Sequence, residues 1–517
     1  MAADGGTPEL LVSHRGIIAI SAMAATLMQA LDSTIANVAL PYMQGSRSTS
    51  YEEITWVLTS YVIAAAIMTA PVGWLSARFG QKQVYLVSII GFTVASMACG
   101  IATSLTQMVI YRLVQGMFGA ALVPLSQATM MNIYPADKRG AAMALWGMGV
   151  MVGPILGPTL GGYLTALYDW RYVFFVNVPF GIASTVGLWM CLPGEKAQSG
   201  LRFDWFGFTM LALGIGALQL MLDRGQVKDW FGSTEVIIEA VAAATGFYLF
   251  LVHMITGEKP FISVALFRDR NFNAGLVAMF AMGMVLLASS ALLAPWLQVL
   301  GGYPVDVAGL LLAPRGIGTM LAMMIAGRIA DRVDPRLLIA IGVGLMWWSL
   351  DRLSTWTPAV DDVTLFVNTV IQGFGMGFVF IPLTVIAFAT LPARLRYEGT
   401  ALFSLLRNIG SAIGISVFET LQSNGARIEH AVLASDASPL NHALAATPGV
   451  ARALAPGTAH GAALLNSMID YQAQVVSYAN VYWLMALLAL PILVLLPLMR
   501  RPRAAVGAGV AAHAAVD

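Results

Sequence analysis

Charged residues are scarce in this chain: Asp, Glu, Lys and Arg make up 11% of its 517 residues, against roughly 25% in soluble domains. Hydrophobic residues make up 58%, and the mean hydropathy is +0.75. A water-soluble globule cannot bury so much apolar surface, so the composition excludes a cytosolic enzyme, a nucleic-acid-binding protein and a disordered chain. The net charge of +1 provides no global field for an acidic partner. The composition therefore predicts a polytopic membrane protein with little soluble mass.

Cysteine is also nearly absent, and both Cys99 and Cys191 lie in apolar runs. A disulfide framework or a zinc site needs more cysteines at recognisable spacing, so both are predicted to be packing residues. The chain also lacks the glycine-rich phosphate loop of ATP-driven pumps, a nucleophile elbow and a His-rich cluster. We therefore predict that the protein is not an enzyme and that it has no metal site and no bound cofactor.

Apolar runs long enough to cross a bilayer recur along the chain. A helix needs about 20 mostly apolar residues to cross a hydrocarbon core of about 30 Å. Fourteen runs are candidates: 16–40, 53–75, 84–103, 107–131, 141–164, 172–192, 205–222, 235–256, 272–298, 306–326, 337–351, 363–390, 398–421 and 480–499. The first run is too long for a signal-peptide core and lacks a preceding basic cluster, so it is predicted to be a retained helix.

Lysines and arginines are distributed unevenly between the two sides of these spans. With the N-terminus placed in the cytoplasm, 18 of the 28 basic residues fall in cytoplasmic segments and 7 in outer segments. This bias predicts that both termini are cytoplasmic and that the number of spans is even. The one long outer segment is 422–479. We interpret it as a solvated spacer, with an amphipathic surface helix over 461–476 as the alternative.

Two short basic segments form an internal repeat. The first contains Gly73, Arg78, Gly80 and Lys82, and the second contains Gly327, Asp331 and Arg332. Each is predicted to be a helix-ending glycine followed by a tight basic turn on the cytoplasmic side. The glycine lets two helices approach closely, and the basic residues meet acidic groups or helix C-termini across the cytoplasmic gap.

These segments resemble the G-x-L-a-D-r-x-G-r-k loop of the major facilitator superfamily, which occurs once in each six-helix half, after helices 2 and 8. Here the second copy follows the tenth span, so two helices are inserted between the halves. The resemblance implies an all-α major facilitator fold with 14 spans arranged as 6+2+6. Its parts are an N-terminal bundle over 1–200, two inserted helices over 201–260 and a C-terminal bundle over 261–517 that includes the periplasmic loop 422–479.

Further motifs indicate a subgroup of that superfamily. They are LDSTIANVALP over 31–41, YRLVQG over 111–116, the glycine-rich run 149–162, DWR over 169–171, NVP over 177–179 and LDRG over 222–225. Together they resemble the fourteen-helix drug:proton antiporters of the EmrB/QacA type, and most closely EmrB-type multidrug exporters. The resemblance covers essentially all of 16–499. The chain departs from the family loop at Ala77, where Asp is usual, and at Asp334, where Gly is usual.

The fifth span carries a stripe of small residues. Gly149, Gly153 and Gly157 recur every fourth residue, which gives a flat surface on which a neighbouring helix can pack closely. Pro154 and Pro158 remove backbone donors and bend the helix. The stripe is interpreted as a tight static contact or as a seal in one state of a rocking transporter, and both interpretations can hold together.

Charges inside spans are the leading functional candidates, since a charge at the bilayer centre costs at least ~2.5–3.5 kcal/mol. Asp32 and Arg112 fall at similar depths in the first and fourth spans. Our hypothesis is that Asp32 is the main proton carrier and that Arg112 tunes it; the alternative is a fixed structural ion pair. Arg407 and Glu419 are further candidates for proton coupling, and Arg315 is a candidate for the gap between the halves.

A substrate cavity is expected between the two halves near the membrane midplane. Its polar lining is predicted to include Gln29, Asn37, Gln115, Gln127, Gln298, Gln372 and Asn408. The 28 methionines and the many aromatic residues suit a surface that re-packs around different ligands, although most of them are expected to serve as bundle core or lipid-facing residues.

The resemblance implies proton-driven efflux of hydrophobic or amphipathic toxic compounds across the inner membrane of a Gram-negative bacterium. It also implies two partners, a periplasmic membrane-fusion adaptor and a TolC-like outer-membrane channel, and 422–479 is the expected place of adaptor contact. The main alternative is a dedicated exporter of one metabolite, such as a fatty acid, an amino acid or a siderophore. A channel or sensor that retained the scaffold is the alternative from a different class.

Overall fold

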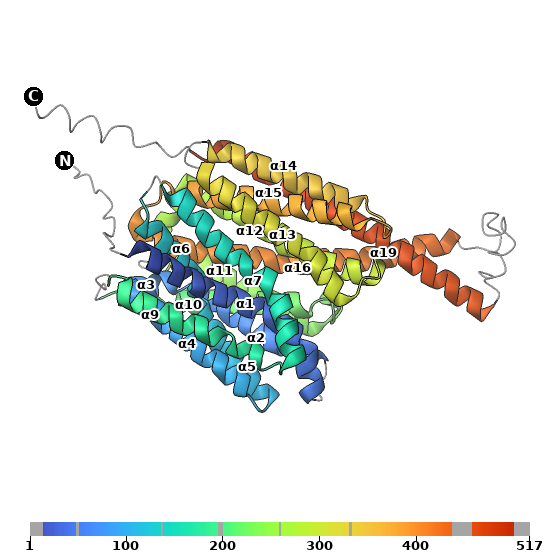
Figure 1. The fold of residues 1–517 in the computed structure, drawn as a ribbon, viewed down its shortest axis with the longest axis horizontal. Coiled ribbons are helices and arrows are strands. Elements are labelled where there is room, and N and C mark those ends of the chain that lie inside the picture. The colour runs from blue at the N-terminus through green and yellow to red at the C-terminus, as the bar shows by residue number, and fades with distance from the viewer. Residues whose placement is uncertain are drawn as a thin grey trace, which may run out of the picture.

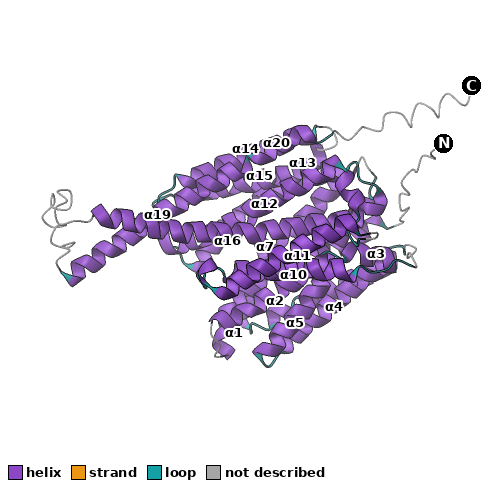
Figure 2. Cartoon of the chain, turned by 180° about the vertical axis from the view of Figure 1, so that it is seen from behind, coloured by secondary structure: helices purple, strands orange, loops and turns teal. Residues whose placement is uncertain are grey.

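The computed structural model describes residues 14–47, 51–135, 138–194, 200–257, 260–329, 333–436 and 458–500. These residues form helices joined by short connections, and the described part contains no strand (Figures 1 and 2). The helices run roughly along one direction, and the first and last described residues lie at the same end of the molecule. We call this end the basic end, because Arg78, Lys82, Arg328 and Arg336 belong to the helix ends found there.

The chain forms a succession of long helices. In chain order they are α1 (Arg15–Arg47), α2 (Tyr51–Thr69), α3 (Val72–Phe79), α4 (Gln81–Ile101), α5 (Leu105–Gly119), α6 (Leu122–Ile133), α7 (Arg139–Leu167), α8 (Tyr172–Phe175), α9 (Asn177–Cys191), α10 (Trp205–Arg224), α11 (Thr234–Thr256), α12 (Arg270–Pro295), α13 (Val305–Ile329), α14 (Pro335–Ser354), α15 (Asp362–Phe388), α16 (Arg396–Asp436), α19 (Ala459–Ala489) and α20 (Pro491–Leu495). The short helices α3, α6 and α8 continue or begin a span.

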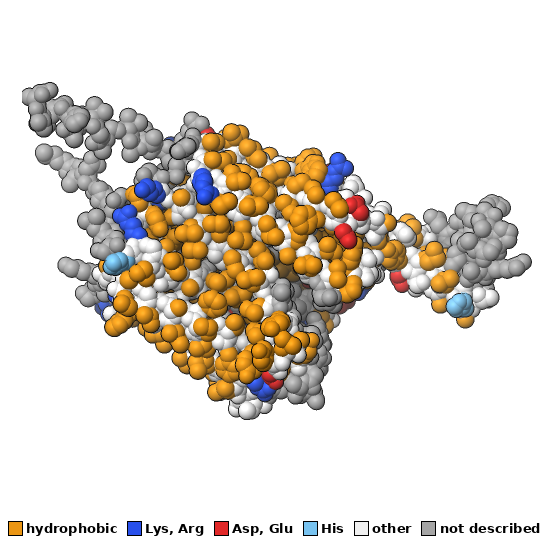
Figure 3. All heavy atoms as spheres, in the orientation of Figure 1, with side chains coloured by type: hydrophobic (Ala, Val, Ile, Leu, Met, Phe, Trp, Pro, Cys, Tyr) orange, Lys and Arg blue, Asp and Glu red, His pale blue; other side chains and the backbone are white. Residues whose placement is uncertain are grey.

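Thirteen segments of the described chain are long and apolar enough to cross a membrane, and the bent pair α2 and α3 makes fourteen. The expectation of an all-α polytopic membrane protein is therefore confirmed. Hydrophobic side chains cover much of the flank in view, and the coloured charges lie mainly toward its ends (Figure 3). This distribution is the one required by a bilayer, where apolar side chains face lipid and charges reach water.

The two sets of helices on either side of α10 and α11 pack in the same pattern. In the first set, α1 packs on α7, α2 on α5, and α4 on α5 and α9. In the second set, α12 packs on α16, α13 on α15, and α14 on α15 and α19. We call these sets the first bundle (α1–α9) and the second bundle (α12–α20). Their repeated pairing is the structural counterpart of the repeated basic segments in the sequence.

Helices α10 and α11 are inserted between the bundles. They pack on each other, and α10 also contacts α2 of the first bundle and α16 of the second. The Thr59 hydroxyl on α2 donates a hydrogen bond to the Asp223 carboxylate at the end of α10. The Ser416 hydroxyl on α16 donates to the carbonyl of Leu222, at 3.0 Å. The inserted pair thus touches both bundles, while the boundaries at residues 200 and 260 stay predictions.

The first basic segment differs in detail from the expectation. The second span breaks after Thr69, and α3 leaves the break at an angle of 55° to the preceding helix, with Pro71 at its N-terminus. Gly73 therefore lies inside α3 and does not end a helix; Gly80 does, with φ of 88°. A Cβ on Gly73 would lie 2.7 Å from the Cα of Glu398 on α16, so this glycine permits close approach between the bundles.

Within the expected loop 422–479, residues 422–436 and 459–479 are helical, which corrects the interpretation of these residues as a spacer, while 437–457 lie outside the described part. Helix α16 continues to Asp436 and α19 begins at Ala459, so the two helices extend beyond the bundles as a pair (Figures 1 and 2). The Ser477 hydroxyl donates to the carbonyl of Gln422 at 2.6 Å. Hydrophobicity predicts where a helix enters the membrane, but it does not predict where the helix ends in water. We call residues 422–436 and 458–479 the helical extension.

The glycine stripe of the fifth span packs α7 against α1. A Cβ on Gly153 would lie 2.5 Å from the Cβ of Ala30 and 2.7 Å from its carbonyl carbon. A Cβ on Gly157 would lie 2.0 Å from the Thr34 hydroxyl oxygen, and Thr34 donates a hydrogen bond to the carbonyl of Gly153 at 3.3 Å. The side chains of Pro154 and Pro158 lie outside the described part of the structure.

We predict that Gly153→Val destabilises the protein by about 1–3 kcal/mol, because the new side chain meets the backbone of α1, which cannot move aside without separating the helices. The measurement is the thermal unfolding midpoint of purified protein in detergent. Gly162→Val is the matched control, since a Cβ on Gly162 in the same helix meets nothing within 4 Å. Equal midpoints for the two variants would contradict the close contact.

Candidate functional site

A buried ion pair joins two helices of the first bundle. Arg112 on α5 donates from Nη1 to Oδ2 of Asp32 on α1 at 2.7 Å. The exposed fractions of the two side chains are 1% and 0%. Asp32 and Arg112 are 80 residues apart in the sequence, and the structure brings them into direct contact. Burial removes water from both charges, so each depends on the other and on neighbouring dipoles for stabilisation.

Two amides complete the surroundings of the carboxylate. Gln115 donates from Nε2 to Oδ1 of Asp32 at 2.8 Å, and Asn177 donates from Nδ2 to the same oxygen at 3.0 Å. The amide oxygen of Gln115 accepts from Arg112 at 2.9 Å. The amide of Asn177 also donates to the Ser96 hydroxyl at 2.9 Å. Asp32 thus accepts three hydrogen bonds from the described part of the first bundle, one from a guanidinium and two from amides.

The guanidinium of Arg112 is held by further contacts in the first bundle. Its Nε donates to the carbonyl of Val57 at 3.1 Å. Its Cζ lies 4.3 Å from the ring centroid of Tyr61 and 5.6 Å from that of Phe174. Cation–π contacts of this kind strengthen when water is excluded. Helices α1, α2, α4, α5 and α9 together enclose the charge, so the site lies within the first bundle.

The other predicted coupling residues lie apart from this site. Arg407 on α16 is half-buried and has a hydrogen bond with the adjacent Asn408, at 3.4 Å. Glu419, further along α16, is half-buried, and its charge interacts with that of Asp223 at the end of α10. Neither residue is brought into contact with Asp32 or Arg112.

The predicted cavity residues fall into different environments. Gln115 is a hydrogen-bond partner of the ion pair, and its place in the substrate cavity stays a prediction. Gln29 donates to the Tyr61 hydroxyl at 3.3 Å. Gln127 and Gln372 are buried with unpartnered amide atoms, Gln298 is half-buried, and Asn408 is exposed. The side chain of Asn37 lies outside the described part of the structure.

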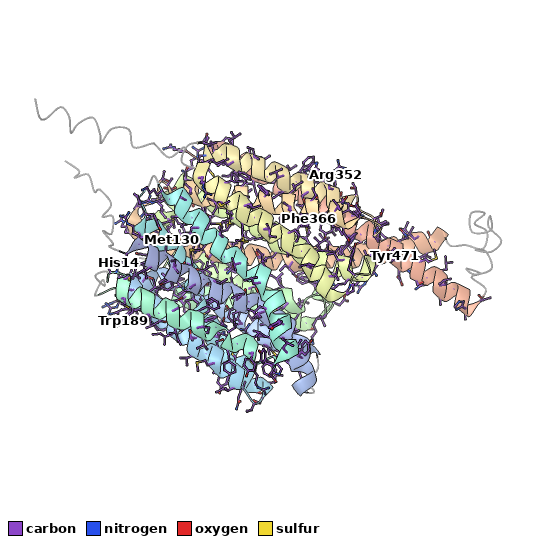
Figure 4. The ribbon with its side chains drawn as sticks, in the orientation of Figure 1. His14, Met130, Trp189, Arg352, Phe366 and Tyr471 are labelled. Carbon is purple, nitrogen blue, oxygen red and sulfur yellow. The ribbon has the colours of Figure 1, made fainter. Side chains whose placement is uncertain are left out.

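The basic segments place some of the predicted motif residues at contacts between helices. The ammonium group of Lys82 donates to the carbonyl of Trp189 at 2.7 Å, near the basic end (Figure 4). A Cβ on Gly327 would lie 2.2 Å from the Cβ of Ala144, so α13 and α7 approach closely there. Arg78 is half-buried. Asp331 and Arg332 lie outside the described residues.

A hydrogen-bond network joins the two bundles at the basic end. The Tyr397 hydroxyl on α16 donates to the Gln81 amide oxygen at 2.8 Å and accepts from the Asn132 amide at 2.8 Å. Arg396 donates to the Asn132 amide oxygen at 3.0 Å, and Gln81 donates to the Thr129 hydroxyl at 2.5 Å. This network, which we call the basic-end latch, joins α16 of the second bundle to α4 and α6 of the first.

Sequence reasoning missed Asn177, Ser96 and Tyr397 as members of these sites. Asn177 belongs to the NVP motif, which was used for family resemblance alone, although a polar residue in an apolar span is itself a functional signal. Ser96 and Tyr397 carry no such signal, because serine and tyrosine are common in spans and at their ends. Their roles depend on which helix faces which.

The fold and the buried ion pair define a multi-pass membrane transporter of two similar helical bundles. The chain belongs to the Major Facilitator Superfamily, whose family model matches residues 22–415. It is 36% identical over 502 residues to the multidrug export protein EmrB of Escherichia coli strain K12, covering 96% of this chain and 98% of that protein. The expectation of an EmrB-type transporter that is not an enzyme is therefore confirmed.

Two further similarities support this assignment. The chain is 34% identical over 428 residues to the fatty acid resistance protein FarB of Neisseria gonorrhoeae, covering 83% of this chain and 84% of that protein. The crystal structure of the human organic anion transporter MFSD10 superimposes with a TM-score of 0.60 at 12% identity, covering 92% of this chain and 99% of that one. The second similarity concerns the fold alone.

We predict that Tyr397→Phe shifts the protein toward states open at the basic end, because the variant loses both hydrogen bonds of the latch hydroxyl. A loss of ~1 kcal/mol changes the population ratio by a factor of about 5. The measurement is the distance distribution between spin labels at Gln83 and Leu337, two exposed positions near this end. Tyr248→Phe, at a residue 66% exposed, is the control and should leave the distribution unchanged.

Proposed function

We propose that the chain is a secondary active exporter that uses inward proton flow to expel amphipathic toxic compounds. The observation that carries this proposal is the Asp32 carboxylate, buried at 0% exposure with one arginine and two amides as its partners. A titratable group at the core of an apolar bundle is expensive and is typical of proton pathways. The similarity to EmrB supports the export of several compounds.

In the proposed mechanism Asp32 carries the proton. In the present arrangement its oxygens accept three hydrogen bonds, from Arg112, Gln115 and Asn177. Protonation neutralises the carboxylate and removes the counter-charge of Arg112, which weakens the attraction between α1 and α5. Because Gly153 and Gly157 couple α1 closely to α7, and α7 packs on α13, a shift of α1 is transmitted to the second bundle.

A dedicated exporter of one metabolite is the second candidate function, and the similarity to a fatty acid resistance protein favours it. The two candidates differ in the number of substrates. Accumulation of chemically unrelated compounds is to be compared in a bacterial strain without its own pumps, with and without this chain. Reduced accumulation of several compounds supports multidrug export, and reduced accumulation of one supports a dedicated exporter.

We predict that Asp32→Asn abolishes transport driven by a pH gradient while it retains drug movement down a concentration gradient. Asparagine preserves the shape of the site but cannot bind and release a proton, so substrate movement continues downhill without coupling. The measurement is uptake of a labelled drug into inverted proteoliposomes, with and without an imposed pH gradient.

The control for this experiment is Asp169→Asn. The Asp169 side chain is 42% exposed and pairs with Arg171, so this change removes a carboxylate outside the site and should leave coupling intact. Drug accumulation by Asp32→Asn in response to a pH gradient would contradict the proposal. Loss of downhill exchange as well would show that the ion pair is structural, which is the alternative interpretation of this residue.

We further propose that the protein resides in the inner membrane of a Gram-negative bacterium and works with a membrane-fusion adaptor and a TolC-like channel. The helical extension is the proposed adaptor site. It bears exposed apolar residues, namely Ile428 at 63%, Val432 at 54% and Met468 at 51%. His430 and Asn466 form a hydrogen bond of 3.1 Å between its two helices. The exposed apolar residues are therefore carried by two helices that contact each other.

We predict that the triple substitution Ile428→Ser, Val432→Ser and Met468→Ser reduces co-purification of the adaptor at least about tenfold, since exposed apolar anchors dominate most interfaces. Transport in proteoliposomes, which contain no adaptor, should be unchanged. Glu429→Gln, on the same part of α16, is the control. Undiminished co-purification by the triple variant would exclude the helical extension as the adaptor site.

A further inference from the structure

Arg315 on α13 is buried among neutral partners. Its side chain is 7% exposed, and its Nη2 donates to the carbonyl of Leu286 at 2.8 Å and to the Ser289 hydroxyl at 2.9 Å. Its Nη1 donates to the Ser290 hydroxyl, and the Met376 sulfur lies 3.4 Å from Nη2. Among the described residues, no carboxylate forms an ion pair with this guanidinium.

This arrangement differs from that of Arg112, although both arginines are buried. Arg112 has the full negative charge of Asp32 at 2.7 Å. Arg315 has a carbonyl and two hydroxyls, which satisfy N–H donors but provide no counter-charge. A buried charge without a counter-charge is costly, so an anion that enters from outside would be stabilised beside Arg315.

The surroundings of Arg315 in the second bundle can be matched to positions around Arg112 in the first bundle. Gln115 and Gly116 on α5 repeat as Gln372 and Gly373 on α15. A Cβ on Gly116 would lie 2.4 Å from the carbonyl oxygen of Tyr61, and a Cβ on Gly373 would lie 2.0 Å from that of Arg315. Arg315 therefore occupies, in the second bundle, the position that Tyr61 has beside Arg112 in the first.

The acid is missing from the second bundle at this position. Thr369 stands where the first bundle has Arg112, three residues before the glutamine in each case. Helix α12, which corresponds to α1, contains neither Asp nor Glu and presents Ser289 and Ser290 to the arginine. The second bundle thus keeps a buried cation, and its described residues include no carboxylate paired with it.

Two buried polar side chains near Arg315 have no hydrogen-bond partner within the part of the chain that the structure describes. The first is Gln372, whose two amide atoms both lack such a partner and whose exposure is 1%. Gln372 lies one turn before Met376, whose sulfur contacts Arg315, so both are on the same face of α15. The hydroxyl of Tyr482 on α19, also 1% exposed, lacks a partner and interacts electrostatically with Arg315.

We propose that Arg315, Gln372 and Tyr482 bind the carboxylate of an amphipathic organic acid carried by this transporter. A carboxylate supplies the missing charge and accepts hydrogen bonds from all three side chains. The side chain of Met376, whose sulfur contacts the guanidinium, contributes apolar surface for the body of such a molecule. This proposal rests on the proposed export function and specifies one class of its substrates.

The position of the site suits a transported ligand. Gly316, the next residue after Arg315, packs against Ile155 of α7, since a Cβ on Gly316 would lie 2.1 Å from the Ile155 side chain. Arg315 is therefore adjacent to the contact between the first and second bundles. Movement of the bundles relative to each other changes access to this place, as alternating access requires.

The test compares two ligands of the same shape, dodecanoate and its methyl ester, by calorimetric titration of the purified full chain in neutral detergent without a pH gradient. Wild type is expected to bind the acid at least about tenfold more tightly than the ester, because charge-assisted hydrogen bonds form to the acid alone. Arg315→Gln is expected to bind both ligands equally. Arg315→Lys is expected to retain part of the preference.

Two controls separate this site from the proton-coupling site. Arg328→Gln removes an exposed arginine from the end of the same helix and should keep the wild-type preference. Asp32→Asn should also keep it, since this measurement needs no coupling; loss of coupling by that variant therefore tests the proposed function alone. If Arg315→Gln does not fold, Gln372→Leu, which retains the arginine, is expected to reduce the preference several-fold.

Three outcomes would overturn the proposal. The first is equal binding of acid and ester by wild type. The second is an unchanged preference in folded Arg315→Gln. The third is displacement of dodecanoate by a short-chain phosphatidylglycerol at equal concentration, because the anion would then be a lipid headgroup and not a carried acid.

Discussion

The need to neutralise charge in an apolar bundle is the constraint on which the first bundle depends. Asp32 and Arg112 are stable at 0% and 1% exposure because each supplies the charge that the other lacks. This pairing sets the relative rotation of α1 and α5, which the amide of Gln115 on α5 reinforces. The amide of Asn177 ties α9 to the same carboxylate. The close glycine contacts of α7 with α1 then extend a fixed geometry toward the second bundle.

The two bundles repeat one packing pattern but distribute charge differently. The first has an acid and a base in contact, which forms a closed electrostatic unit. The second has Arg315 among serines and a carbonyl, with Gln372 and Tyr482 unpartnered beside it. Because the bundles share a packing pattern but differ in their buried charges, the proposal assigns proton binding to the first bundle and binding of the carried molecule to the second. This division of labour is the functional proposal that the structure supports best.

Contacts between the bundles are of two physical kinds. Along α7 and α13, small residues such as Gly327 permit close backbone approach, which tolerates sliding but gives no direction. At the basic end, the latch of Tyr397, Gln81 and Asn132 consists of directional hydrogen bonds that hold only at one separation. A combination of close small-residue contacts and directional hydrogen bonds is compatible with a rocking motion of the bundles.

The sequence by itself determined the class, the fourteen spans and the family, because apolar length and short motifs are local properties. It also marked Asp32 and Arg112 as costly charges. Only the tertiary structure decided that these two meet, that Asn177 joins them and that no acid in the described part of the chain pairs with Arg315. Such contacts depend on helix rotation and join residues far apart in the chain. The bend before α3 and the helical extension of α16 and α19 were likewise decided by packing between helices, which hydropathy does not record.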